Sequence, residues 1–471
     1  MQAETHFHEL PIVRAGALLR SGTLTSTALT RHSLERIARL DPHLNAFVTL
    51  CAERALEEAD EADRDLRAGR ERGPLQGIPY GLKDIYDTAG IATTCQSRLL
   101  AGRVPGTDAE VQARLRAGGA VLLGKMTTYE FALGGPSFDL PAPPARNPWH
   151  LEHIAGGSSS GSAVAVAAGL CRVGMGSDTA GSIRYPAAAC GTVGLKPSYG
   201  LVPRSGVFPL AWSLDHCGPL TWDVEDCAAV MSVVAGHDAR DPASRGVPAP
   251  PFMQRLNEGV EGLRIGVVRH YYEREGAADA ATVEAIDGAL AVLERAGAVI
   301  EDVELPDYEL FNAAARTLQY AEAYAIHERD LRAHGDLYGR ICRLRLLLGA
   351  FIPASDLVQA QRVRRQLAAI LNRQVLGRFD ALVTACTLGP ALRFDEAKAN
   401  PNSPIQATPF NLTGNPALVL PIGLSPEGLP LSVQLVGRLF DDPLLLRIGR
   451  TLEDAQPVKA RPTASLRLDR G

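Results

Sequence analysis

Two short runs rich in glycine, serine and threonine stand close together in the sequence. Residues 154–169 read IAGGSSSGSAVAVAAG, and residues 176–191 read GSDTAGSIRYPAAACG. A serine hydroxyl among small residues could act as a nucleophile, because small neighbours let backbone N–H groups approach the oxyanion that forms in acyl transfer. An unassisted serine is a weak nucleophile at neutral pH, so this chemistry requires a base elsewhere in the chain.

Other uses of such runs fit the residues less well. A phosphate-binding P-loop ends in Gly-Lys-Ser/Thr, whereas the first run has no lysine and Lys196 in GTVGLKPS is followed by Pro197. A flexible Gly/Ser linker is followed by more polar sequence, yet AVAVAAGL follows here at once. Phosphate binding at a helix N-terminus stays open as an alternative.

The base for a serine nucleophile could be histidine or lysine. GSSSG at 157–161 matches the G-x-S-x-G pattern of histidine-assisted serine hydrolases, but no clear buried strand precedes it. Lys83 directly follows the apolar residues 78–82, where a solvated lysine would be out of place. Burial would lower its pKa from about 10.4 by up to ~3–5 units and make it a neutral base. The alternative is a surface lysine paired with Asp84.

The overall composition indicates a soluble globular protein. The 471 residues are 46% hydrophobic and 21% charged, and the formal net charge of -5 is too small to favour nucleic acid or a membrane as partner. No apolar run is long enough to span a membrane, and the first residues do not resemble a secretory signal. The eight cysteines form no CxxC pair, which indicates reduced thiols in a cytoplasmic protein without a metal site.

The elements that must position these residues follow two patterns. Residues 1–75 are predicted to be helical, with one helix over residues 25–40 that ends before Asp41-Pro42. From residue 77 on, short apolar segments alternate with helical ones, as in CRVGMGSD and DAATVEAIDGALAVLERAGA. This alternation predicts an α/β fold in which helices cover a sheet. Residues 310–376 are predicted to be mostly helical, with a break near Pro353.

We expect one domain over residues 1–471. Its parts are a helical N-terminal part (1–75), the catalytic motifs (77–235), a surface connection (236–262), and the remaining strands and substrate-region helices (263–460). The connection contains four prolines, but strand-like segments on both sides of it could share one sheet. A division into two domains stays open.

Several blocks of the sequence resemble the amidase signature family. The two Ser-rich motifs, the lysine motif GIPYGLKDIYDTAGI, and the blocks GAVLLGKMTTYEFALG, SLDHCGPLTWDVEDCA and PFNLTGNPALVLPIG occur in the order expected of that family. The resemblance extends from about residue 77 to residue 454. It implies the amidase signature fold, an α/β architecture with a large, mixed, twisted β-sheet core covered on both faces by α-helices.

The resemblance also implies a Ser–cis-Ser–Lys catalytic triad. Ser182 aligns with the nucleophile, Ser158 with the bridging serine that follows a cis peptide bond, and Lys83 with the general base. Neutral Lys83 would accept a proton from Ser182 through Ser158 while Ser182 attacks the carbonyl carbon. The chemistry requires no metal and no organic cofactor.

Residues around the nucleophile would support it. The oxyanion hole would be formed by the backbone amides of Thr179, Ala180, Gly181 and Ser182. Asp178 and Arg184 would fix the nucleophile loop, although a plain structural ion pair is an equally open interpretation. The family often has glycine at the positions of Ser160 and Ala180; the methyl group of Ala180 would reshape the acyl pocket.

Substrate preference is less well defined by the residues. Tyr129, Phe131 and Leu133 are substrate-contact candidates by resemblance, with ordinary core packing as the alternative for Phe131 and Leu133. The glutamyl-tRNA amidotransferase subunit of the family carries an Arg-Tyr-Asp-Gly block that YAEAYAIHERDLRAHGDLYG lacks.

We therefore expect a stand-alone cytoplasmic serine amidase (a hydrolase of linear amides) that acts on small aryl or aliphatic amides. Its partners would be a small-molecule substrate and, in a homodimer, a second copy of itself, with no nucleic acid and no membrane. The alternatives are a carbamate (urethane) or ester hydrolase, a subunit of an amidotransferase, and a non-catalytic binding protein.

Overall fold

The computed structural model describes residues 7–399, 405–455 and 462. In these residues, eleven strands form one mixed sheet in the order β1-β3-β2-β4-β6-β5-β10-β11-β9-β7-β8. The strands are β1 (Phe47–Leu50), β2 (Pro79–Lys83), β3 (Val121–Met126), β4 (Val173–Asp178), β5 (Val193–Lys196), β6 (His216–Thr221), β7 (Arg264–Val267), β8 (Val299–Asp302), β9 (Ala381–Thr384), β10 (Ala417–Leu424) and β11 (Pro430–Gly437).

The sheet combines parallel and antiparallel pairs. β2 runs parallel to β3 and to β4, and β7 runs parallel to β8 and to β9. The central strands β4, β6, β5, β10, β11 and β9 are joined by antiparallel pairs. Strands on both sides of residues 236–262 therefore belong to one sheet, and the α/β prediction with a large mixed sheet is confirmed.

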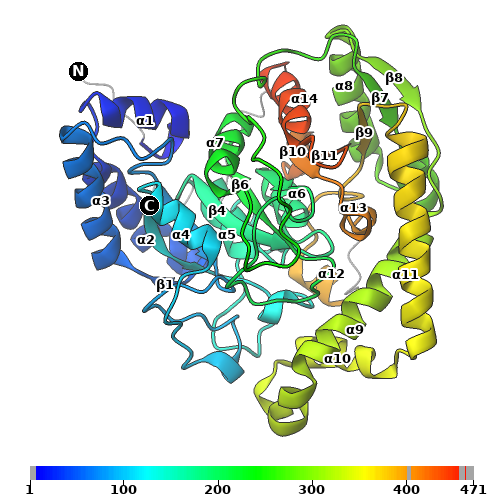
Figure 1. Cartoon of the computed structure of the whole chain (residues 1–471), viewed down its shortest axis with the longest axis horizontal. Helices are drawn as coiled ribbons and strands as arrows, with labels where there is room; N and C mark the ends of the chain where they lie inside the picture. Colours follow the sequence, from blue (N-terminus) through cyan, green and yellow to red (C-terminus); the bar gives the residue numbers. More distant parts are fainter. Residues whose placement is uncertain (1–6, 400–404, 456–461, 463–471) are drawn as a thin grey trace.

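Helices cover both faces of this sheet (Figure 1). The α-helices are α1 (Ile12–Arg20), α2 (Ser26–Leu44), α3 (Ala52–Arg67), α4 (Glu110–Ala117), α5 (Ser160–Ala167), α6 (Arg184–Cys190), α7 (Val224–Val234), α8 (Ala280–Arg295), α9 (Tyr308–His334), α10 (Arg340–Leu347), α11 (Ala354–Ala369), α12 (Phe394–Ala399), α13 (Thr408–Thr413) and α14 (Asp442–Ala455).

The alternation of side chains along each strand explains why helices pack against both faces of the sheet. Side chains of successive strand residues point to opposite faces. In β3, Leu122 belongs to the hydrophobic cluster that includes α1, α4, α7, α8 and α14, whereas Val121 and Leu123 belong to the cluster that includes α2, α3, α5 and α6. Both faces are thus apolar, which requires a helical layer on each.

The N-terminal part differs from the prediction in two details. The helix predicted to end before Asp41-Pro42 continues through Pro42 to Leu44 and is capped by Asn45 in the left-handed conformation. The Asp41 carboxylate accepts hydrogen bonds from the amides of Ala46 and Phe47, which stabilises the chain reversal just beyond the helix. The short edge strand β1 was not predicted, because its four residues lie between two strongly helical segments.

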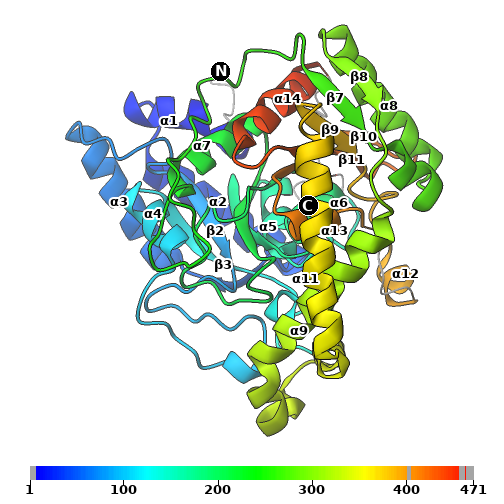
Figure 2. The ribbon, with the colours of Figure 1, turned by 45° about the vertical axis from the view of Figure 1, so that its right-hand side comes forward.

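The C-terminal half agrees with the predicted pattern. Residues 310–376 form α9, α10 and α11, with breaks at the 3-10 turns η5 (Gly335–Leu337) and η6 (Leu348–Phe351), the second of which precedes Pro353. Figures 1 and 2 place α8 to α11 on the side of the molecule opposite α1 to α3. Phe252 and Leu256 of the 236–262 connection are buried, so this segment is anchored to the core. Residues 456–460 lie outside the described residues.

Candidate active site

The two Ser-rich runs and Lys83 meet at one edge of the sheet. β2 ends at Lys83 and the parallel neighbouring strand β4 ends at Asp178, so the segments that follow them emerge side by side. Ser182 lies in the turn between β4 and α6, and Ser158 lies just before α5. Backbone contacts join the two runs, because the Ser159 amide donates to the Ser182 carbonyl oxygen at 3.2 Å.

Lys83 is hydrogen-bonded to two serines inside the protein. Its Nζ donates to Ser158 Oγ at 2.6 Å and to Ser177 Oγ at 2.9 Å. The Lys83 and Ser158 side chains are 0 and 1% exposed, and the Gly157–Ser158 peptide bond is cis. The alternative of a surface lysine paired with Asp84 is wrong, because Asp84 pairs with the equally buried Lys125 at 3.3 Å.

Burial favours the neutral form of the Lys83 amine. It lowers the pKa of Lys83 from 10.5 to about 7, although Asp178 and Asp215 act in the opposite direction. Its direct partners are hydroxyl groups, and among the described residues no carboxylate forms an ion pair with this amine that would hold the proton on it. A substantial neutral fraction at neutral pH follows, as a lysine general base requires.

Ser182 differs from Lys83 and Ser158, the other two residues of the predicted triad, in its access to solvent. Its side chain is half-buried, whereas Lys83 and Ser158 are inaccessible. A nucleophile has to meet the substrate, while a relay and a base can act from behind it. The structure therefore brings the three predicted residues into one region, with the most accessible of them at the position aligned with the nucleophile.

The turn that carries Ser182 is folded around the carboxylate of Asp178. The amides of Gly181 and Ile183 donate to this carboxylate at 2.7 and 3.1 Å. Gly181 has a φ of 116°, a conformation open to glycine but strained for other residues. Since the Gly181 amide is engaged by Asp178, the oxyanion-hole prediction now concerns the amides of Thr179, Ala180 and Ser182.

Asp178 and Arg184 form a fully buried ion pair at 2.9 Å. Arg184 also donates to Asn411 Oδ1 and Gln434 Oε1, and the Asn411 amide group donates back to the Asp178 backbone oxygen. Burial by itself would raise the pKa of Asp178, but Arg184 and the other donors hold that pKa well below its usual range. This network joins the turn that carries Ser182 to α13 and β11.

Three contributors were missed by the sequence reasoning: Ser177, Asn411 and Gln434. Ser177 lies inside the motif GSDTAGS, near the end of β4 and beside Lys83. Its membership of that motif was the signal that the sequence offered. Asn411 and Gln434 lie more than 220 residues after Arg184. No local pattern connects them with the site, and only the fold does.

The substrate-contact candidates separate into two groups. Tyr129 belongs to the site: a Cβ on Gly157 would lie 2.3 Å from its ring, and its amide donates to the Ser158 oxygen at 3.2 Å. Phe131 and Leu133 are 1 and 4% exposed and lie in the hydrophobic core. The ring of Phe131 lies 4.5 Å from that of His327.

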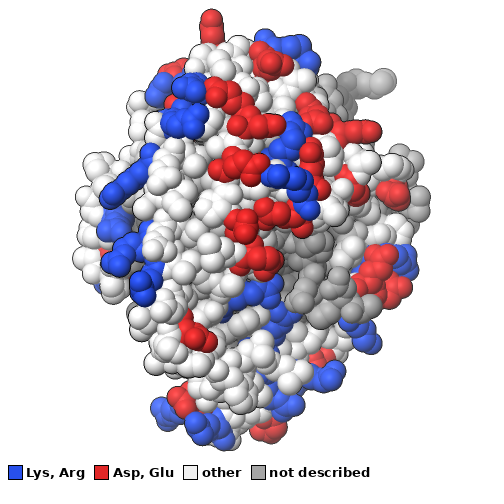
Figure 3. Space-filling model, turned by 90° about the vertical axis from the view of Figure 1, so that its right-hand side faces the viewer, with Lys and Arg blue, Asp and Glu red and all other residues white. Residues whose placement is uncertain are grey.

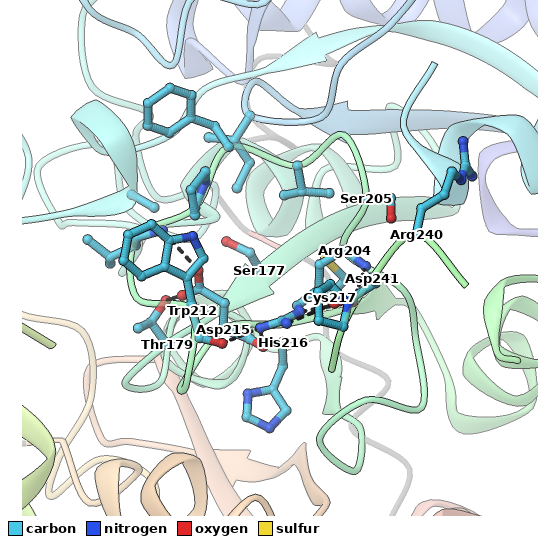
Figure 4. A pocket seen from close by; sticks show the side chains of 17 residues that line it. Ser177, Thr179, Arg204, Ser205, Trp212, Asp215, His216, Cys217, Arg240 and Asp241 are labelled. Carbon is cyan, nitrogen blue, oxygen red and sulfur yellow. Dashed lines mark hydrogen bonds and ion pairs between the residues drawn. The ribbon is translucent and has the colours of Figure 1, made fainter. Parts of the chain in front are cut away.

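A cavity of about 220 Å³ adjoins the site on the Ser177 side (Figure 4). Thr179 donates to the Asp215 carboxylate at 2.6 Å, and both residues line this cavity together with Trp212 and Arg204. Burial raises the pKa of Asp215 to about 6. The hydrogen bond connects the turn that carries Ser182 with the loop that leads into β6.

Metal-ligand clusters and membrane-spanning helices are both absent from the described part of the chain. Within residues 7–399, 405–455 and 462, no group of three or more His, Cys, Asp or Glu side chains is placed to hold a metal ion. None of the helices in these same residues combines the length and apolar character needed to cross a bilayer.

Comparisons with known proteins place this geometry in a family. A family model described as Amidase matches residues 28–446. The A-type subunit of glutamyl-tRNA(Gln) amidotransferase from Synechococcus sp. (strain WH7803) is 37% identical over 95% of this chain and 97% of its own length. The structure of the corresponding amidotransferase subunit from Thermotoga maritima has a TM-score of 0.83 at 33% identity and covers 98% of both chains. Native peptide amidase from Stenotrophomonas maltophilia has a TM-score of 0.86 at 34% identity, covering 97% of this chain and 99% of its own.

The amidotransferase relatives overturn part of the sequence-based expectation. The prediction of a stand-alone amidase for small aryl or aliphatic amides, with a small-molecule substrate and no nucleic-acid partner, is wrong. It relied on the absence of one four-residue block from residues 320–339, whereas the similarity to these relatives extends over almost the whole chain. The matched family model, the shared fold and the convergence of Lys83, Ser158 and Ser182 together show that this chain belongs to the amidase signature family.

Proposed function

We propose that this chain is the amide-hydrolysing subunit of a glutamyl-tRNA(Gln) amidotransferase. In this role it releases ammonia from a primary amide, and partner chains use the ammonia to amidate glutamyl-tRNA(Gln). The observation that carries the hydrolytic half is the buried, partly neutral Lys83 at 2.6 Å from Ser158 Oγ. The full-length similarity to the A-type subunit of this amidotransferase supports the transfer half.

The first chemical step forms an acyl-enzyme on Ser182. Ser182 Oγ attacks the amide carbon while its proton passes to Ser158 Oγ, and the Ser158 proton passes to Lys83 Nζ. The carbonyl oxygen becomes an oxyanion, which the amides of Thr179, Ala180 and Ser182 would stabilise. Each such donor typically contributes ~2.7–4 kcal/mol of transition-state stabilisation.

The second half of the cycle restores the serine. The C–N bond breaks as the relay returns a proton from Lys83 through Ser158 to the nitrogen, so the leaving group departs as ammonia. Water then attacks the acyl carbon and gives a proton to the same relay. The bond between that carbon and Ser182 Oγ breaks, the relay returns the proton to Ser182 Oγ, and the carboxylic acid is released. Ionic contacts between Asp178 and Arg184 hold the turn in position during both steps.

The half-exposed Tyr129 is the side chain that we propose for contact with the substrate amide. Its ring covers Gly157, next to the relay serine, and it is anchored to Ser158 through its backbone. Phe131 and Leu133 were also predicted to contact the substrate, but their buried side chains favour the alternative of ordinary core packing.

The test is transamidation by the complex that is recovered from the native host through a tag on this chain. The complex is incubated with glutamyl-tRNA(Gln), ATP and either glutamine, asparagine or ammonium chloride. We expect glutaminyl-tRNA from the wild type with an amino-acid amide, and from Ser182→Ala with ammonium chloride alone. Failure of the wild type to form glutaminyl-tRNA with any of the three nitrogen sources would reject the proposal.

A further inference from the structure

Four large apolar side chains on one helical segment face solvent. α10 continues into η6, and Leu344, Leu347, Leu348 and Phe351 are 52, 39, 49 and 83% exposed. Their spacing of i, i+3, i+4 and i+7 is that of the apolar stripe by which a helix usually packs onto its own protein. Here the stripe, called the apolar ridge below, is turned outward.

The ridge is held firmly by the opposite side of the same segment. Cys342, Leu346 and Gly349 are buried there. The backbone of η6 lies so close to α9 that a Cβ on Gly349 would be 2.1 Å from the carbonyl oxygen of Tyr320. Arg345 donates to Tyr320 Oη at 3.0 Å. The four exposed side chains are therefore presented by a fixed, preformed surface.

Positive charge predominates in the segment that carries the ridge, although the Asp139 carboxylate accepts a hydrogen bond from the Arg340 amide at the start of α10. Residues 340–373 contain seven arginines, one aspartate and neither lysine nor glutamate. Arg340 lies one helical turn before Leu344, and Arg343 lies one turn before Leu347, so both arginines flank the ridge. Figure 3 shows Lys and Arg side chains along one side of the face that carries α11, Asp and Glu side chains gathered in its upper middle, and side chains of both signs at its lower end.

We propose that the apolar ridge docks an amphipathic helix of a partner protein that carries leucine-like side chains flanked by Asp and Glu. A straight stripe along a rigid helix complements the stripe of a second helix, and exposed apolar patches on soluble proteins mark interaction sites. Flanking arginines favour an acidic partner. An RNA would engage the arginines but leave the apolar ridge in water. The inference goes beyond the proposed function, because nothing in the amide chemistry uses this surface.

The test is site-specific photo-cross-linking in the native host. The full chain is produced with benzoyl-phenylalanine in place of Phe351 or, as the control, of Phe138, which is 65% exposed outside the apolar ridge. We expect position 351 to cross-link to one partner protein. The cross-linked segment of that partner should be an amphipathic helix with apolar residues at helical spacing and Asp or Glu beside them. The Arg340→Glu, Arg343→Glu double variant should lower this yield by roughly tenfold. The melting temperature and amide hydrolysis of the isolated chain should not change.

Several results would overturn the docking proposal. These are a cross-link at position 351 to RNA, lipid or a second copy of this chain, a cross-linked segment without acidic residues, and no cross-link at all. An equal yield of the same product from position 138, or an unchanged yield in the charge-reversed variant, would also reject it.

Discussion

Lys83 Nζ lies 2.6 Å from Ser158 Oγ, and neither side chain is reached by solvent. The contact joins the end of a central strand to the loop before α5. In the mechanism that we propose, this contact would let the proton of the partly exposed Ser182 leave through a second hydroxyl group. The predictions below follow from this arrangement and from the network that holds it.

Removal of the members of the triad should have graded effects. Ser182→Ala removes the nucleophile and should lower kcat for ammonia release by on the order of 10⁴-fold or more. Lys83→Ala should reduce turnover severely, and Ser158→Ala somewhat less, because water can replace a missing relay hydroxyl. Coupled ammonia assays on each purified variant measure this, with circular dichroism to verify the fold. Near-normal activity of Ser182→Ala would exclude it as the nucleophile.

Amide hydrolysis should decline on acidification through neutrality. The active form of Lys83 is the neutral amine, and its pKa is about 7. Above this pH the base is mostly neutral, and below it kcat/KM should fall by about tenfold per pH unit. Ammonia release is measured from about pH 5 to about pH 9, and the fold is verified at each pH. A flat profile across neutrality would contradict a lysine base.

Replacement of Lys83 should stabilise the protein at neutral pH. The folded-state pKa of Lys83 is lowered, so the unfolded chain binds more protons between about pH 7 and pH 10.5 and wild-type stability should rise with pH across this window. Lys83→Met removes the free-energy cost of deprotonating the buried amine, which is roughly 4 kcal/mol at pH 7. The variant also loses two hydrogen bonds of about 1 kcal/mol each, which offsets part of this gain in stability. Urea denaturation of both proteins at several pH values tests it. Parallel stability curves for the two proteins would refute the lowered pKa.

Neutralisation of Asp178 should damage both fold and activity. Asp178→Asn leaves Arg184 charged and buried without its counter-ion, a change that typically costs ~3–5 kcal/mol. It also releases the turn that carries Ser182, so turnover should fall more than the folded fraction does. The matched control is Asp395→Asn, whose partner Arg393 is exposed. If both variants unfolded at the same urea concentration, the Asp178–Arg184 pair would have no special role in holding the turn.

A methyl group on Gly157 should disturb the site through Tyr129. The added Cβ would lie 2.3 Å from the Tyr129 ring, so the ring must move away from the relay serine. We expect Gly157→Ala to lower kcat/KM by at least about tenfold, and the double variant with Tyr129→Leu to recover part of the loss in Tm. Gly135→Ala is the control, since a Cβ there meets nothing within 4 Å. Equal activity of the two alanine variants would show that the ring is not fixed by Gly157.

Much of the site could be predicted because its chemistry is concentrated in short motifs. Lys83 stands out as a charge in an apolar strand, and Ser158 and Ser182 lie in two small-residue runs. Asn411 and Gln434 reach the same site only because α13 and β11 fold over it, and no local pattern encodes that approach. The helix through Pro42 was mispredicted, since the stabilising Asp41 contacts lie beyond the helix end. The stand-alone prediction was wrong because it gave one absent block more weight than the similarity to amidotransferase subunits that extends along the chain.

The most direct test of the central claim is to trap the acyl-enzyme. The complex is mixed with glutamine, quenched in acid within the first turnover, digested and analysed by mass spectrometry. Our account predicts a glutamyl adduct on the peptide that contains Ser182, absent from Ser182→Ala and accumulating less in Lys83→Ala. An adduct on another residue, or ammonia release by Ser182→Ala at the wild-type rate, would contradict it.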